Sequence, residues 1–199
     1  PPESIRARDE RREPFVMRPG SWQPDERRAR PTAEEAPLLI LGIESTCDET
    51  GVALVEDGFR VVASEVISQV PLHERFGGVV PEIASRAHAE VITRLVERAL
   101  RSAGITRAEA ATRLDAVAVA NRPGLIGALL VGLTAAKTLS LAWDLPLVGV
   151  DHVHAHIASV ILRTPPPSEP PPEEDLFPAV SLVVSGGHTT LYASESYSR

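Results

Sequence analysis

The chain has 199 residues, of which 43% are hydrophobic and only 4% aromatic, and its formal net charge is −7. This composition is sufficient for a core, predicts that the core is aliphatic, and lacks the excess of positive charge typical of a nucleic-acid-binding domain. The single cysteine, Cys47, excludes an internal disulfide framework and is typical of a reducing compartment, so we expect a cytoplasmic protein.

The ends of the sequence indicate a piece of a longer protein. It begins Pro-Pro without a methionine, and it stops at Arg199 shortly after an apolar run. No apolar run appears long enough to cross a membrane, and the N-terminus lacks the apolar stretch of a secretory signal. We therefore expect no membrane association.

Shifts in composition divide the chain into four parts. Residues 1–36 are rich in Arg, Glu and Pro and predict a disordered extension. Residues 37–163 alternate regularly between apolar segments and form a first lobe. Residues 164–176 are a Pro/Glu-rich insertion, and residues 177–199 begin a second lobe that is truncated here.

The elements of the first lobe follow one another in a regular order. We predict three strands at residues 38–44, 52–56 and 59–68, followed by a helix at 83–103. A strand at 114–120, a helix at 124–143, a strand at 145–150 and a helix from 151 onward come next. After the insertion, strands at 179–185 and 188–194 form a hairpin. Asp57-Gly58 predicts the turn between the second and third strands, and Gly104 the end of the long helix. This βββαβαβα order predicts an α/β protein with the fold of actin, sugar kinases and Hsp70: one complete lobe and the start of a second.

Three of the six histidines fall within five residues, at His152, His154 and His156. Imidazole is the commonest protein ligand of catalytic metals. On a strand all three would share a face, whereas on a helix only His152 and His156 would be neighbours. Asp151 is a suitable helix N-cap, and apolar residues follow at helical spacing: Val153, Ile157, Val160 and Ile161. The pattern predicts a metal-binding pair, His152 and His156; a chance mixture of core and surface histidines is the alternative.

Two loops of small polar residues are candidate ligand sites. The first strand ends in residues 44–51, Glu-Ser-Thr-Cys-Asp-Glu-Thr-Gly, whose amides can bind phosphate and whose carboxylates can orient water or a metal. Residues 183–190 contain two glycines that allow a ligand to approach the backbone closely. Ordinary polar hairpins are the alternative for both loops.

Two other segments have open interpretations. Residues 121–127, Asn-Arg-Pro-Gly-Leu-Ile-Gly, lie between a strand and a helix, where amides can meet an anion or glycines can allow close helix packing. At the start of the long helix, polar side chains face either a cleft or solvent: Glu82, Ser85, Arg86 and His88. We expect the isolated His73 at the surface.

Four segments together resemble one family. They are LGIESTCDET from Leu41, GGVVPEIASR from Gly77, PGLIGALLVG from Pro123 and VSGGHT from Val184. In order and spacing across residues 38–194 they are similar to the bacterial TsaD family, the tRNA N6-adenosine threonylcarbamoyltransferases, formerly called O-sialoglycoprotein endopeptidases. The resemblance implies an acyltransferase of tRNA modification. It moves threonylcarbamoyl from threonylcarbamoyl-AMP to the N6 amine of the adenosine beside the anticodon, in tRNAs that read codons beginning with A.

The resemblance also implies site residues, cofactors and partners. One divalent metal per subunit, iron(II) or alternatively zinc(II), would be held by His152 and His156, with a third ligand from the far end of the second lobe. We therefore expect this portion to be inactive alone. Asp48 and Glu49 are the acids near the reaction centre, and adenine nucleotide occupies the cleft. The substrate loop comprises Val183, Val184, Ser185, Gly186 and Gly187. The partners are tRNA, a paralogous TsaB-like subunit and a TsaE-like ATPase.

Three alternative functions fit the residues less well. A related carbamoyltransferase shares a His-x-His-Ala-His run, but segments 47–50 and 78–82 fit the tRNA family better. A non-catalytic paralogue would lack the histidine pair. A zinc protease would need Glu directly after the first histidine, where Val153 stands. The chain departs from the family pattern at Asn121-Arg122, so the family's ligand contacts are not carried over to that loop.

Overall fold

The computed structural model describes residues 16–17, 37–162, 172–185 and 189–196. The predicted disordered extension therefore lies outside the described residues except at Val16–Met17, which form a two-residue strand, β1. Most of the predicted Pro-rich insertion and the loop at residues 186–188 also lie outside them.

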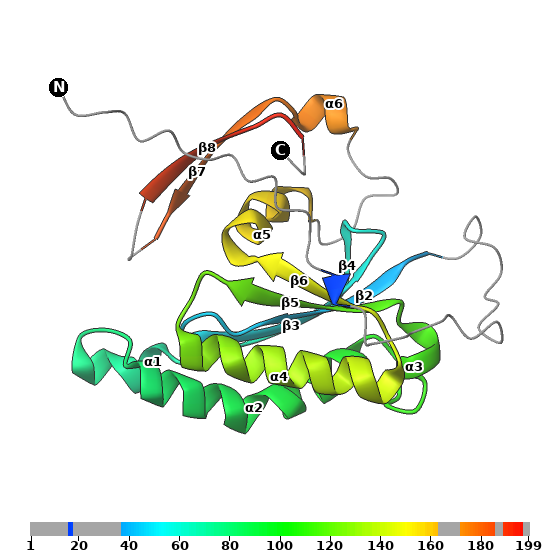
Figure 1. The fold of residues 1–199 in the computed structure, drawn as a ribbon, viewed down its shortest axis with the longest axis horizontal. Helices are drawn as coiled ribbons and strands as arrows, with labels where there is room; N and C mark the ends of the chain where they lie inside the picture. The colour runs from blue at the N-terminus through cyan, green and yellow to red at the C-terminus, as the bar shows by residue number, and fades with distance from the viewer. Residues whose placement is uncertain (1–15, 18–36, 163–171, 186–188, 197–199) are drawn as a thin grey trace.

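One sheet of six strands forms the centre of the first lobe (Figure 1). Its spatial order is β1-β6-β5-β2-β3-β4. β2, β3 and β4 are antiparallel, β5 and β6 run parallel to β2, and β1 pairs antiparallel with β6. The bounds of β2 to β6 are Leu39–Glu44, Glu49–Glu56, Arg60–Ser68, Ala116–Arg122 and Leu147–Asp151. β3 begins three residues earlier than predicted, because the polar residues from Glu49 pair with the end of β4.

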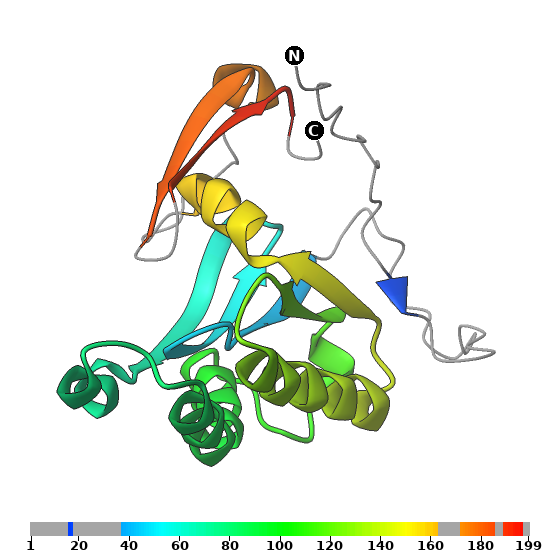
Figure 2. The same ribbon diagram turned by 60° about the vertical axis from the view of Figure 1, so that its left-hand side comes forward.

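Helices cover the two faces of the sheet unequally (Figure 2). The long helices α2 (Pro81–Ser102) and α4 (Ile126–Trp143) lie side by side on one face, and the short α5 (His152–Ala158) lies on the other. The hairpin of β7 (Ala179–Val184) and β8 (Thr189–Ser194) lies beyond α5. This arrangement confirms the predicted α/β class and the actin, sugar kinase and Hsp70 type of fold.

Several very short helices were not predicted. They are α1 (Val70–His73), α3 (Ala110–Arg113), α6 (Glu173–Leu176) and the 3-10 turns η2 (Glu74–Phe76) and η3 (Ser159–Ile161). Three or four residues complete about one turn, which is too short to leave a periodic apolar pattern in the sequence. One of them, α1, matters for the site because it carries a buried histidine.

Two predicted turns are confirmed by their backbone angles. Asp57 and Gly58 both have positive φ (52° and 79°), as the central residues of a type I′ turn require, and the amide of Phe59 donates to the carbonyl of Glu56 (3.2 Å). Gly104 has φ 67° and follows α2, and the amides of Gly104 and Ile105 bond to the carbonyls of Arg101 and Leu100. This pair of bonds is the Schellman arrangement that ends a helix.

Side-chain alternation along β2 gives the sheet two different faces. Leu39, Leu41 and Ile43 are buried beneath the long helices. The alternate residues of the strand face α5, so the last of them, Glu44, points to the same side as the histidine helix. Gly51 stands opposite Glu44 on β3 and leaves space for its side chain.

α4 corrects the expectation that no segment could span a membrane. By length and composition alone this helix is apolar enough to do so. A core helix of a folded domain passes the same test, and α4 packs small residues, among them Ala128, Gly132 and Ala136, into the lobe.

Candidate metal centre and substrate cleft

The histidine helix is fixed at the carboxyl edge of the sheet by Asp151. One carboxylate oxygen of Asp151 accepts hydrogen bonds from the amides of Val153 (2.9 Å) and His154 (3.3 Å), which confirms the predicted N-cap. The other oxygen lies 3.2 Å from Nε of Arg122 at the end of β5. Since α5 has only seven residues, these contacts are a large part of what orients it.

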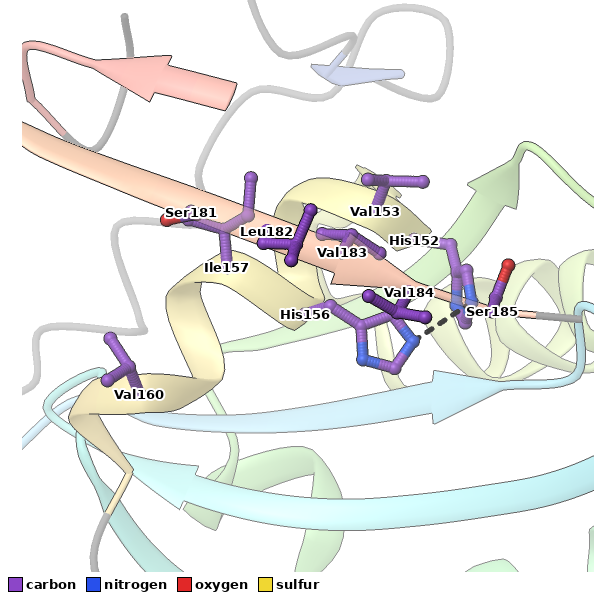
Figure 3. A pocket seen from close by; sticks show the side chains of 10 residues that line it. All are labelled: His152, Val153, His156, Ile157, Val160, Ser181, Leu182, Val183, Val184 and Ser185. Carbon is purple, nitrogen blue, oxygen red and sulfur yellow. Dashed lines mark hydrogen bonds between the residues drawn. The ribbon is translucent and has the colours of Figure 1, made fainter. Parts of the chain in front are cut away.

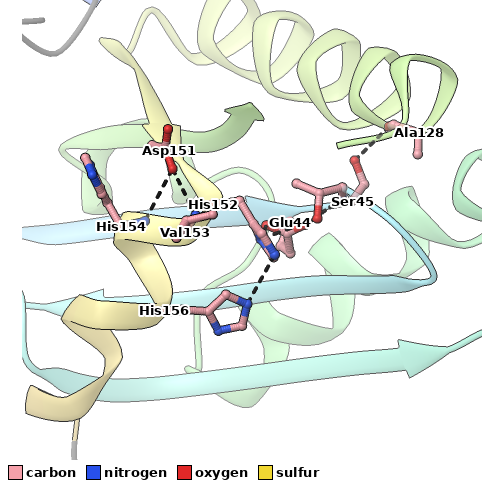
Figure 4. Close-up of polar contacts among 9 residues, drawn as sticks. Glu44, Ser45, Ala128, Asp151, His152, Val153, His154 and His156 are labelled. Carbon is pink, nitrogen blue, oxygen red and sulfur yellow. Dashed lines mark hydrogen bonds and ion pairs between the residues drawn. The ribbon is translucent and has the colours of Figure 1, made fainter. Parts of the chain in front are cut away.

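The structure brings His152 and His156 together, as the helical spacing predicted (Figure 4). Their Nε2 atoms are 3.1 Å apart, and their rings meet edge to face with centroids 4.5 Å apart. His154 points away from the pair, and its ring instead approaches that of Tyr192 on β8.

Glu44 orients His152; the sequence placed this acid in the candidate ligand loop 44–51 but not among the metal or catalytic residues. Its carboxylate lies 3.0 Å from Nδ1 of His152, and Thr46 Oγ1 lies 3.3 Å from the same nitrogen. The hydrogen bond to Glu44 raises the pKa of His152 above its ordinary value, in opposition to burial. Burial alone would raise the pKa of Glu44, but hydrogen bonds from His152 and Thr46 outweigh it and lower that pKa. The signal in the sequence was an acid at the end of an otherwise apolar strand.

The donor set fits a divalent metal. With Nδ1–H of His152 directed at Glu44, its Nε2 carries a lone pair, which is the arrangement of a carboxylate-oriented histidine ligand. Two nitrogens that each lie about 2.1 Å from one tetrahedral ion are roughly 3.4 Å apart, close to the separation seen here. Across the described ranges, no three His, Cys, Asp or Glu side chains form a ligand cluster, so this part of the chain offers a pair of ligands.

The loop between β2 and β3 carries the predicted acids, but neither is the carboxylate that contacts His152. Asp48 is half-buried and Glu49 is exposed at the first position of β3. The thiol of Cys47 lies just before these acids in the sequence. Partial burial of its sulfur and the charge of Asp48 raise its pKa, so the thiol is protonated at neutral pH and a nucleophilic role is disfavoured.

A cleft of about 530 Å³ separates α5 from β7 (Figure 3). The histidine pair lines this cleft together with Val183, Val184 and Ser185 of the predicted substrate loop. The other lining residues are Val153, Ile157, Val160, Ser181 and Leu182. The predicted substrate-loop residues Gly186 and Gly187 lie outside the described residues.

The loop at residues 121–127 packs closely on the same region. A Cβ at Gly124 would lie 2.7 Å from the carbonyl oxygen of Thr46, which is fixed by a 2.8 Å bond from the amide of Leu125. In the first turn of α4, the carbonyl of Ala128 accepts a hydrogen bond from the hydroxyl of Ser45 (2.9 Å). The sequence left two interpretations of this segment, anion binding and close helix packing; the structure shows the close packing.

Two histidines lie where the sequence did not place them. His73, expected at the surface, is 3% exposed, because α1 folds back against the start of α2. His88 lies on the inner face of α2 and is fully buried. Neither therefore faces the cleft or solvent.

Comparison with known proteins decides the family. The family model described as TsaD, tRNA N6-adenosine threonylcarbamoyltransferase, matches residues 60–199. The chain belongs to the TsaD family. A TsaD-family relative of that name from Bacillus subtilis is 49% identical over 80% of this chain and 42% of its own length. One from Symbiobacterium thermophilum is 52% identical over 81% of this chain and 44% of its own.

The chain thus spans less than half the length of these curated TsaD relatives. Among solved structures, YeaZ from Pseudomonas aeruginosa is similar at a TM-score of 0.43 and 21% identity, over 57% of this chain and 44% of that one.

Proposed function

We propose that the protein to which this TsaD-family chain belongs transfers a threonylcarbamoyl group from threonylcarbamoyl-AMP to the N6 amine of the adenosine beside the anticodon of tRNA. The observation that carries the proposal is the histidine pair, oriented by Glu44 and open to the cleft beneath β7. Relatives named for this activity are about half identical to the chain.

The residues of the chain have distinct roles in this proposal. His152 and His156 hold a divalent ion, iron(II) or zinc(II), that supplies Lewis acidity toward phosphate or carbonyl oxygens when bound. Ser185 and the adjoining loop of β7 bind the adenylate in the cleft. Asp48 or Glu49 orients the attacking amine or accepts its proton.

Two protein partners belong to the proposal, a TsaB-like paralogue and a TsaE-like ATPase. The exposed face of α4 supports a protein contact, since Ile126, Leu130 and Leu141 are 86%, 61% and 76% exposed. Beside it, α2 and α4 enclose a mostly apolar groove of about 230 Å³. We assign the paralogous subunit to this surface.

Metal analysis of the full-length protein together with a tRNA modification assay tests the function. We expect His152→Ala and His156→Ala each to lower metal content and to abolish modification, whereas His154→Ala, on the same helix but outside the pair, retains both. Retention of metal and activity in the two pair variants would refute the assignment. Carbamoylation of a small molecule, with tRNA left unmodified, would favour the related carbamoyltransferase.

A further inference from the structure

A chain of buried polar side chains lies under the loop that carries Asp48 and Glu49. Its members are Thr50, Gln69, His73 and His88, each at most 3% exposed. They come from three segments, namely β3, α1 with its N-cap residue, and α2, and neither the metal site nor the cleft uses them. Buried polar groups are costly unless every one is paired, so their pairing reveals what the arrangement requires.

The hydrogen bonds of this buried network have defined donors and acceptors. The amide of Val80 donates to Nδ1 of His73 (3.3 Å), and Nε2 of His73 then donates to Oε1 of Gln69 (3.1 Å). Nε2 of Gln69 donates to Nδ1 of His88 (3.1 Å), where Thr50 Oγ1 also donates (2.7 Å). Nε2 of His88 donates to the carbonyl oxygen of Cys47 (3.0 Å). Each bond determines the next, because a carbonyl can only accept and an amide N–H can only donate.

This network closes on the backbone of the acidic loop from two sides. His88 holds the carbonyl of Cys47, and the amide of Gln69 holds the carbonyl of Asp48 at 2.8 Å. Two consecutive carbonyls are thereby fixed directly beneath the acids. A loop of polar residues with exposed side chains at Cys47 and Glu49 has no apolar packing that would serve the same purpose.

We propose that His88 is a positioning residue for the reaction-centre acids, holding the Cys47–Asp48 backbone through its Nε2–H while Gln69 and Thr50 fix the ring. The inference rests on the proposed function, since it assumes that Asp48 and Glu49 act in the transfer. Burial lowers the pKa of His88, which keeps the ring in the neutral form that accepts at Nδ1. The charged groups that face it are Glu44 and Asp48, which favour protonation, and His73, which opposes it.

A pair of amide substitutions separates the two nitrogens of His88. Asparagine places its amide near the position of Nδ1, and glutamine near that of Nε2. His88→Gln therefore keeps a donor for Cys47, whereas His88→Asn keeps only the acceptor for Thr50 and Gln69. Ser140→Ala is the control: it removes a buried hydrogen bond to Leu145 (2.6 Å) at the far end of α4.

The experiment uses metal-loaded full-length protein and measures hydrogen exchange of residues 44–50 and kcat for tRNA modification, both per folded molecule. We expect H88N to speed exchange of the loop and to lower kcat about 10- to 100-fold with KM unchanged. H88Q should stay within about threefold of wild type in both, and S140A should change neither while lowering the unfolding temperature.

The outcomes distinguish the inference from the proposed function. Equal kcat and equal loop exchange in H88N and wild type would overturn the positioning role, as would an equal loss of kcat in H88Q and H88N. If H88N does not fold, Gln69→Met keeps the volume and removes the bond to His88 Nδ1; unaltered exchange and kcat in that variant would have the same meaning. If the wild-type protein has no transfer activity, the proposed function is overturned. Faster loop exchange in H88N would then still show that His88 holds the Cys47–Asp48 backbone.

Discussion

At the scale of single residues, the candidate site depends on a carboxylate that the sequence placed in a ligand loop but did not assign to the histidine pair. Glu44 ends a strand whose alternation turns it toward α5, and there it holds Nδ1 of His152. Such an outer partner sets the tautomer and the ring orientation of a metal ligand. The two acids next in sequence, Asp48 and Glu49, lie in a loop that is held separately.

Replacing Glu44 is expected to weaken metal binding without removing a ligand. In Glu44→Gln the neutral amide no longer supports the basicity of His152, and metal affinity should fall about 10- to 100-fold. Competition with a chelator on full-length protein measures the change. Glu49→Gln, at an exposed acid of the same segment, should retain wild-type affinity; an equal loss in both variants would contradict the role of Glu44.

His88 is expected to make the protein less stable in acid. Its pKa is lowered in the folded state from an ordinary value of 6.5, so the unfolded chain binds the proton first as pH falls. The contribution is fully present above pH 6.5 and is lost below it, with a slope that approaches about 1.4 kcal/mol per pH unit. Urea unfolding of wild type and His88→Gln between pH 7 and pH 5 measures it. Parallel pH profiles for the two proteins would show that His88 does not titrate in this way.

At the scale of elements, the short helix α5 carries the metal pair and depends on its N-cap residue, Asp151. Seven residues form a marginal helix alone, and Asp151 supplies both the cap and the ion pair with Arg122. The neighbouring backbone also restricts the ring of His152. The turn at Gly124 packs on Thr46, and the hydroxyl of Thr46 lies 3.3 Å from Nδ1 of His152.

Removing the cap is expected to disorder the histidine pair. Asp151→Ala should cost about 0.5–2 kcal/mol of stability and lower metal affinity, because two amides lose their acceptor. Asp151→Asn retains a capping oxygen and should lose less of both. Unfolding of the full-length protein measures the stability, and competition with a chelator measures the metal affinity. If both variants bind metal as tightly as wild type does, the cap does not orient the histidines.

At the scale of the whole molecule, the two faces of the sheet have different tasks. The face beneath α5 opens into the cleft with β7, while α2 and α4 cover the other face and α4 presents apolar side chains outward. The hairpin also exposes apolar side chains: Val180, Leu182, Val184 and Leu191 are each more than 60% exposed, and Leu182 and Val184 are among the residues that line the cleft. Exposed apolar surface of this size is typical of a ligand or protein contact.

A charge on the outer face of α4 is expected to release the paralogous subunit. Leu130→Glu keeps helix propensity and places a carboxylate at a position that is 61% exposed, so the fold should be retained while binding weakens at least tenfold. Titration of the full-length protein with the paralogue measures the affinity. Val66→Glu, at an apolar residue of β4 that is 59% exposed and away from α4, controls for the added charge; unchanged binding of Leu130→Glu would move the interface elsewhere.

The sequence by itself determined the order of the main elements, two turns and the pairing of His152 with His156. These follow from local rules: alternation in strands, helical spacing, and glycine or aspartate at turns. Only the tertiary structure decided that Glu44 meets a histidine 108 positions away, or that His73 and His88 are buried in one hydrogen-bonded chain. Such contacts depend on which strand faces and helix faces pack together, and spacing along the chain does not specify that.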